Sequence, residues 1–274
     1  MENPSASSPA VLPKKTAMLW HWLLACLLAI VFGVEMASCF WPLPFGGWTD
    51  TAFIVIATAS TLAAQWRRLP LQNVLQAAFG IAAIGGGFSA LGAKTDLPFG
   101  PFVFTSGVGP LIFKTLPWAL PLIWVVVVLN SRGVARLILR PWRKTKAHGF
   151  RVIGMTALLA LLFDVAFEPF ATRVKHFWLW LPTAWPLTWQ GASVMNFLAW
   201  ALITIMILLF VTPVMIIKKP RSKTGPDFYP LCLWFGALIL FGTGCAVTGI
   251  WLPVFVDALI GIAVAVFAVR GAMW

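Results

Sequence analysis

The sequence predicts an all-helical, polytopic integral membrane protein, and two observations lead to that prediction. Hydrophobic residues make up 60% of the 274 residues and charged residues only 10%, and the mean hydropathy is +0.90. The apolar residues also form runs of about 20, the length that crosses the hydrocarbon core of a bilayer as a helix. The formal charge of +12 does not indicate a nucleic-acid partner, because the basic residues lie in short segments between these runs.

About eight apolar runs are expected to span the membrane, and the count falls to seven if the short last hairpin is re-entrant. Residues 1–16, rich in Ser and Pro, are interpreted as a disordered tail. Residues 17–270 form a single transmembrane domain, whose first run is too long for the core of a cleaved signal peptide. The expected spans are residues 17–40, 50–66, 71–92, 111–130, a run ending at 168, 191–217, 228–251 and 252–269.

The positions of Lys and Arg predict the orientation of these spans. Basic residues concentrate in cytoplasmic loops of membrane proteins, and eight spans with both termini in the cytoplasm place every basic cluster there. Such loops are also expected to contact anionic lipids of the bilayer. The expected location is therefore the cell (cytoplasmic or inner) membrane. The clusters are Lys14 with Lys15, Arg67 with Arg68, residues 131–151, residues 218–223 and Arg270.

A pair of carboxylates closes the fifth apolar run. Asp164 and Glu168 are four residues apart, so their side chains share one face of a helix. Pro169 follows, and because the residue before a proline disfavours the helical region, the helix is expected to end near Glu168. Two carboxylates this close, half out of water, cannot both ionise cheaply. One of them is therefore expected to be a neutral general acid beside its base, although they could also simply line a polar helix end.

The acidic residues as a group favour the outer half of the predicted bundle. Six of the eight map there or to outer loops, and acids have little influence on orientation, so the topology alone does not explain this distribution. The pattern predicts a polar, acidic chamber that opens toward the outer leaflet. The alternative, that an acid only flanks the end of a span, is our interpretation for Asp50. The six are Glu35, Asp50, Asp96, Asp164, Glu168 and Asp257.

The segment 93–110 is too rich in Gly and Pro to continue a helix. Its backbone polar groups need protein partners at membrane depth, so it is expected to fold back into the bundle beside Asp164. In that position Asp96 would join the carboxylate pair. Phe99, Phe102 and Phe104 would then line an apolar channel.

Several classes of enzyme are excluded by what the sequence lacks. The three histidines are scattered, which argues against the clustered imidazoles of a membrane di-iron oxygenase. No glycine-rich nucleotide loop is present. None of the four cysteines has CxxC spacing, so neither zinc nor a disulfide framework is indicated. We therefore expect no cofactor and no metal.

An ordered set of motifs gives the first indication of a family. The segment TDLPFGPFVFTSGVGP at residues 95–110 resembles the G-x-PFG-x-Y-x-Y-T-x-x-LGP signature of the carotenoid biosynthesis membrane proteins, which include bacterial γ-carotene hydratases and archaeal bisanhydrobacterioruberin hydratases. The likeness covers roughly residues 87–205. It continues through Trp124, FDVAFEP at residues 163–169, FWLW at residues 177–180, Trp189, Gly191, Asn196 and Trp200.

The resemblance implies an enzyme that adds water across a terminal isoprene double bond of an acyclic carotenoid. A carboxylic acid protonates the alkene, a tertiary cation forms and water adds to it. We expect Asp164 as the donor because it lies deeper, Glu168 as its partner, and Asp96 as the group that orients the water. A carotenoid or other long isoprenoid would be the substrate, and other enzymes of the pathway would be partners. The expected substrate-binding residues are Glu35, Phe99, Gly100, Phe102, Phe104, Trp178, Trp180 and Asn196.

The chain departs from the family pattern at positions that bear on activity. Phe102 and Phe104 replace two tyrosines, Ser89 stands where a glutamate is common, and Glu168 replaces an aspartate. Two other functions therefore stay open: a non-catalytic carotenoid- or lipid-binding membrane protein, and a proton-coupled lipid transporter. The absence of an internal repeat counts against the transporter.

Overall fold

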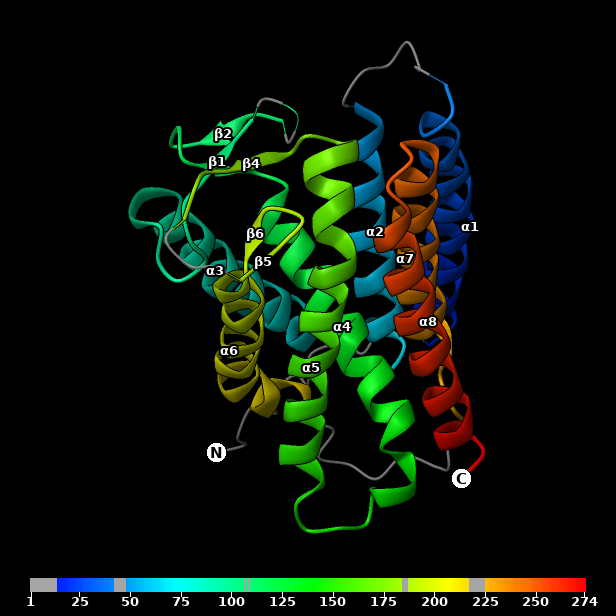
Figure 1. Ribbon diagram of the computed structural model, residues 1–274. Helices are drawn as coiled ribbons and strands as arrows, with labels where there is room; N and C mark the ends of the chain where they lie inside the picture. The colour runs from blue at the N-terminus through cyan, green and yellow to red at the C-terminus, as the bar shows by residue number, and fades with distance from the viewer. Residues whose placement is uncertain (1–13, 42–47, 106, 108, 184–186, 217–224) are drawn as a thin grey trace, which may run out of the picture.

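The computed structural model describes residues 14–41, 48–105, 107, 109–183, 187–216 and 225–274. In this part of the chain, eight long helices form a bundle, with three short two-stranded sheets beside them (Figure 1). Residues 1–13 of the predicted tail and residues 42–47 lie outside the described residues. The helices are α1 (Lys14–Ser38), α2 (Trp48–Trp66), α3 (Leu71–Thr95), α4 (Leu120–Ile138), α5 (His148–Pro169), α6 (Val194–Val211), α7 (Tyr229–Val247) and α8 (Trp251–Ala272).

Seven helices in the described part of the chain are long and apolar enough to cross a membrane, which confirms a multi-pass helical bundle. The helix outside this set is α2, whose interior is built largely from Ala, Ser and Thr. Its polar residues bond to neighbouring helices: Thr61 accepts a hydrogen bond of 2.9 Å from Asn130 of α4, and Ser60 is hydrogen-bonded to Tyr229 of α7. The low apolarity of α2 therefore reflects contacts inside the bundle.

The fourth helix begins and ends later than the sequence predicts. Residues expected at its start form a hairpin instead, in which β2 (Leu111–Ile112) pairs with β3 (Leu116–Pro117). The helix begins only where Pro121 can occupy its first turn. At the other end it continues through Arg132 and Arg136, because arginine is a good helix former and its charge marks the membrane side without ending the helix.

The α5 helix ends at Pro169, close to the predicted end near Glu168, but the chain does not leave the helical region there. The α5 helix includes Pro169 and runs on into a π-helical segment, η3 (Phe170–Val174). Pro169 has no N–H to bond the carbonyl of Val165. The indole N–H of Trp189 donates to that carbonyl instead, at 3.0 Å. This long-range bond stabilises the helix through the proline and keeps Glu168 inside a continuous helix.

The loop after α3 and the segment after η3 each contribute one strand to a two-stranded sheet. Strand β1 (Phe102–Phe104) pairs antiparallel with β4 (Trp178–Trp180), with Phe102 opposite Trp180. Phe99 and Phe102 are buried, so the loop folds into the bundle as predicted. A second hairpin, β5 (Thr188–Trp189) with β6 (Ala192–Ser193), leads into α6, where Ser193 accepts a hydrogen bond from the backbone N–H of Met195.

A glycine-rich stretch of α3 allows close contact with α4. A Cβ atom built on Gly85 would lie 2.4 Å from the ring of Trp124, and one on Gly86 would lie 2.9 Å from Pro121. A Cβ atom built on Gly87 would have no neighbouring atom within 4 Å. Gly85 and Gly86 thus form a small-residue contact face of α3, whereas Gly87 points away from it.

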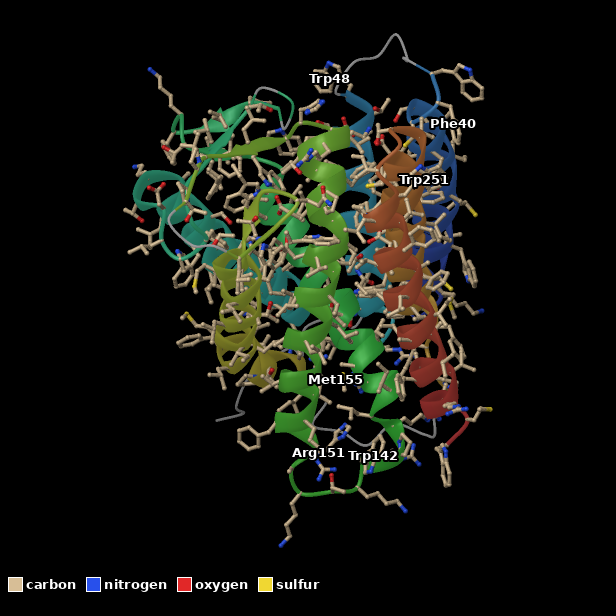
Figure 2. The ribbon with its side chains drawn as sticks, viewed as in Figure 1. Phe40, Trp48, Trp142, Arg151, Met155 and Trp251 are labelled. Carbon is tan, nitrogen blue, oxygen red and sulfur yellow. The ribbon has the colours of Figure 1, made fainter. Side chains whose placement is uncertain are left out.

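The two ends of the bundle differ in chemistry. Phe40, Trp48 and Trp251 lie at one end, while Trp142 and Arg151 lie at the other (Figure 2). The α4–α5 connection and the C-terminus share the end with Arg151, and β1 and β4 lie at the opposite end (Figure 1). Basic residues 131–151 are therefore far from the segment that follows α5.

This arrangement makes the orientation testable. A reporter fused after residue 145 is expected to be cytoplasmic, and one fused after residue 183 is expected to be external, because the positive charge concentrates at the first site. Accessibility of each reporter in intact cells measures this directly. If both reporters were found on the same side, α5 would not cross the membrane as described.

Candidate active site

A cavity beside the β1–β4 pair gathers most of the site residues that the sequence predicts. Its volume is about 360 Å³ when the open space at its mouth is included. Seven of the predicted residues line it: Phe99, Phe102, Phe104, Glu168, Trp178, Trp180 and Asn196. Three other residues complete the wall: Ser89, Leu120 and Trp200.

Glu168 is the acidic residue on this wall. Its side chain is 1% exposed, and its Oε1 atom accepts hydrogen bonds from two indole N–H groups, from Trp178 at 2.8 Å and from Trp180. Alternate residues of a strand point to the same face, so the FWLW pattern presents both indoles to one carboxyl group. Two fixed N–H donors on one oxygen form a polar contact suited to negative charge.

Asp164 lies one helical turn earlier and is also 1% exposed. The side-chain amide of Asn196 donates to its Oδ2 atom at 2.6 Å, and its Oδ1 atom has no hydrogen-bond partner among the described residues. Asp164 does not line the cavity, whereas Asn196 does. Glu168, and not Asp164, therefore lines this cavity, and Asp164 contacts the wall residue Asn196.

Aromatic rings make up most of the remaining wall. Phe102 packs against Phe104 and Trp180, with ring centroids 5.0 and 5.4 Å apart. Trp200 stacks on Trp124 at 3.8 Å, and the indole N–H of Trp124 donates to Ser89 at 3.0 Å. The site thus combines one buried carboxyl group with several π faces, which attract a positive charge.

Two predicted site residues in the loop after α3 do not line the cavity. Asp96 is exposed and ends α3 in a left-handed conformation, its N–H donating to the carbonyl of Gly92. Because the chain turns at this residue, it is not brought to the carboxyl pair. Gly100 is beside the cavity: it has φ of +103°, and a Cβ there would lie 3.3 Å from Ser193 and 3.7 Å from Trp180. Glycine suits both this backbone conformation and the close packing.

Glu35 lines a second, apolar cavity of about 610 Å³. It forms an ion pair with Lys175, whose Nζ atom is also 2.7 Å from Asp50. Burial lowers the pKa of the Lys175 ammonium, but Asp50 and Glu35 outweigh it, and the pKa lies above its ordinary value.

A pair of aromatic side chains separates the two cavities. Phe167 lines the second cavity and Trp178 the first, and their ring centroids are 5.6 Å apart. The acids predicted to share one chamber therefore belong to separate groups. The buried carboxyl group of Asp257 in α8 joins neither and has no hydrogen-bond partner among the described residues.

Three wall residues were not among the predicted site residues: Ser89, Leu120 and Trp200. The sequence contains a signal for two of them. Trp200 is four residues after Asn196, so the helical repeat alone puts both on one face of α6. Ser89 is one turn after Gly85 on the small-residue face of α3. Leu120 carries no chemical signal that would distinguish it from other apolar residues.

Comparison with known proteins identifies the family of this chain. Residues 49–264 match the family described as carotenoid biosynthesis protein. The chain is 26% identical over 117 residues to bisanhydrobacterioruberin hydratase of Haloarcula japonica, an alignment that covers 42% of this chain and 37% of that protein. No solved structure matches. Because the family match covers well over half of the residues, the chain belongs to the carotenoid biosynthesis protein family.

Proposed function

We propose that this protein is a carotenoid hydratase of the cell membrane, which adds water across a terminal isoprene double bond of an acyclic carotenoid. The observation that carries the proposal is Glu168, a buried carboxyl group on the wall of an aromatic cavity, held by the indoles of Trp178 and Trp180. The family supports a carotenoid substrate, and the relative from Haloarcula japonica is named a hydratase.

In the first proposed step, the carboxylic acid of Glu168 transfers its proton to the terminal double bond. The π electrons form the new C–H bond, leaving a tertiary cation on the adjacent carbon and a carboxylate on Glu168. The two indole N–H groups already point at Oε1, so they stabilise the negative charge as it develops. The faces of Trp180 and Phe102 stabilise the cation, each by about 0.5–2 kcal/mol when desolvated.

In the second proposed step, water forms a C–O bond to the cation and returns a proton to the Glu168 carboxylate. The enzyme is thereby restored, and the reaction needs neither an oxidant nor a reductant. Asn196 lines the cavity and is proposed to orient the water, the role that the sequence suggests for Asp96. Asp164 in turn holds the amide of Asn196.

The proposed roles of the two carboxyl groups differ from those expected from depth in the helix. A general acid must lie within hydrogen-bond reach of the atom it protonates. Glu168 lines the cavity, so a substrate bound there would lie within its reach, whereas Asp164 does not line it and is hydrogen-bonded to Asn196. We therefore propose Glu168 as the donor and Asp164 as the residue that shares its proton and positions Asn196.

Expression in a host that accumulates acyclic carotenes tests the proposal. The extracted pigment is expected to gain the mass of one water, and a strain expressing Glu168→Gln provides the control. Unchanged pigment, with the protein present in the membrane, would contradict hydratase activity. Phe102 and Phe104 stand where the family pattern has tyrosines, so the cavity wall lacks two hydroxyl groups. Unchanged carotene that copurifies with the protein would instead favour a binding protein.

A further inference from the structure

A third cavity lies at the opposite end of the bundle from the β1–β4 pair. Its volume is about 820 Å³ including its mouth, and it forms where the ends of α2 and α4 meet the starts of α5 and α7. The charged residues on its wall are Arg68, Arg132, Arg136, Arg140, Arg143 and Asp227. It shares no lining residue with the cavity around Glu168.

The wall of this cavity has a large excess of positive charge. Five arginines and one carboxyl group give a formal charge of +4 with His148 neutral. Asp227 is already engaged by Arg67 at 3.3 Å and Arg68 at 3.0 Å. Arg132, Arg136 and Arg140 follow at intervals of four residues, so they line one face of α4 and its extension, where like charges repel.

Several charged and polar groups on the wall of this cavity are incompletely paired. Arg132 is only 9% exposed, and it takes part in none of the ion pairs found among the described residues. Arg140 Nε and His148 Nδ1 are buried without a hydrogen-bond partner among the described residues. Buried polar groups in proteins are nearly always hydrogen-bonded, so this cavity has donors and charge that suit an anion.

We propose that this cavity binds a phosphate-bearing anion. The planar guanidinium group donates two parallel hydrogen bonds to a phosphate, and arginine is the preferred residue for such contacts. The phosphate could belong to the headgroup of an anionic phospholipid or to a soluble phosphate compound, because both present the same oxygens. The proposal does not depend on the hydratase function.

Purified protein in a neutral detergent tests the soluble source with inorganic pyrophosphate as the probe. At constant ionic strength, pyrophosphate is expected to raise the unfolding temperature of the wild type in a saturable way. Arg132→Gln and the less buried Arg140→Gln should bind roughly tenfold more weakly, because each loses charge-assisted hydrogen bonds. Lys144→Gln removes the same charge from an exposed position outside the cavity, and its response should match the wild type.

Native mass spectrometry tests the lipid source. After incubation with mixed phosphatidylglycerol and phosphatidylcholine, the wild type and Lys144→Gln should retain phosphatidylglycerol, and Arg140→Gln should lose it. A response to pyrophosphate alone would identify a soluble ligand, and retention of phosphatidylglycerol alone would identify a headgroup. The proposal is overturned if neither probe binds, or if both arginine variants bind them as the wild type does.

Discussion

Replacement of Glu168 by Gln is expected to lower carotenoid hydration by roughly 10²–10⁴-fold, the usual contribution of general acid catalysis. Glutamine keeps the shape of the side chain and a carbonyl oxygen for the indoles of Trp178 and Trp180. It cannot donate a carboxylic proton, so folding should persist while proton transfer fails. Pigment mass, together with the amount of protein in the membrane fraction, measures the two effects separately.

Asp164→Asn is the matched comparison for this variant. It removes the other carboxyl group of the pair. Asp164 accepts a hydrogen bond from Asn196 and does not line the cavity. We expect a smaller loss than for Glu168→Gln, caused by displacement of Asn196 and by the altered sharing of the proton. If the Asp164→Asn variant were inactive and the Glu168→Gln variant active, Asp164 would be the proton donor and Glu168 its partner. Full activity of both variants would show that the pair is not the acid.

Gly85→Ala is expected to destabilise the protein by about 1–3 kcal/mol, the usual cost of overpacking. The added Cβ would lie 2.4 Å from the ring of Trp124. That ring cannot easily move, because it stacks on Trp200 and donates to Ser89. The substitution should therefore separate α3 from α4 and disturb the wall of the cavity around Glu168. Thermal unfolding in detergent, with pigment mass as a second readout, measures both consequences.

Gly87→Ala controls for the change of residue type on the same helix. A Cβ at this position meets no atom within 4 Å, and alanine is a better helix former than glycine. Its unfolding temperature should equal or slightly exceed that of the wild type. Equal losses for the two variants would mean that the contact between Gly85 and Trp124 does not contribute to stability as described.

Features that depend on composition or on short-range spacing could be predicted from the sequence. Runs of apolar residues identify membrane helices, because a bilayer-spanning backbone must satisfy its own hydrogen bonds. The motif FWLW singles out Trp178 and Trp180 as candidate site residues, and both line the cavity. The glycine and proline content of residues 93–110 predicts a loop that enters the bundle, and Phe99 and Phe102 are buried as expected.

Features that depend on distant partners could not be predicted in this way. Helix α5 continues through Pro169 with the help of Trp189, which donates to the carbonyl that the proline leaves free. Glu35 forms an ion pair with Lys175, 140 positions along the chain, and this pairing places it away from the carboxyl groups of α5. The backbone turn at Asp96 similarly decides that this residue stays exposed. Each outcome depends on tertiary contacts that local patterns do not specify.

We propose that this protein hydrates a carotenoid, with a carboxyl group that protonates the double bond before water adds. The most direct measurement supplies an acyclic carotene to the purified protein in water enriched in heavy oxygen. The account predicts a product that is heavier by one labelled water, with the label in its new hydroxyl group. Recovery of unchanged carotene, or a hydroxyl oxygen that comes from dissolved O₂, would contradict it.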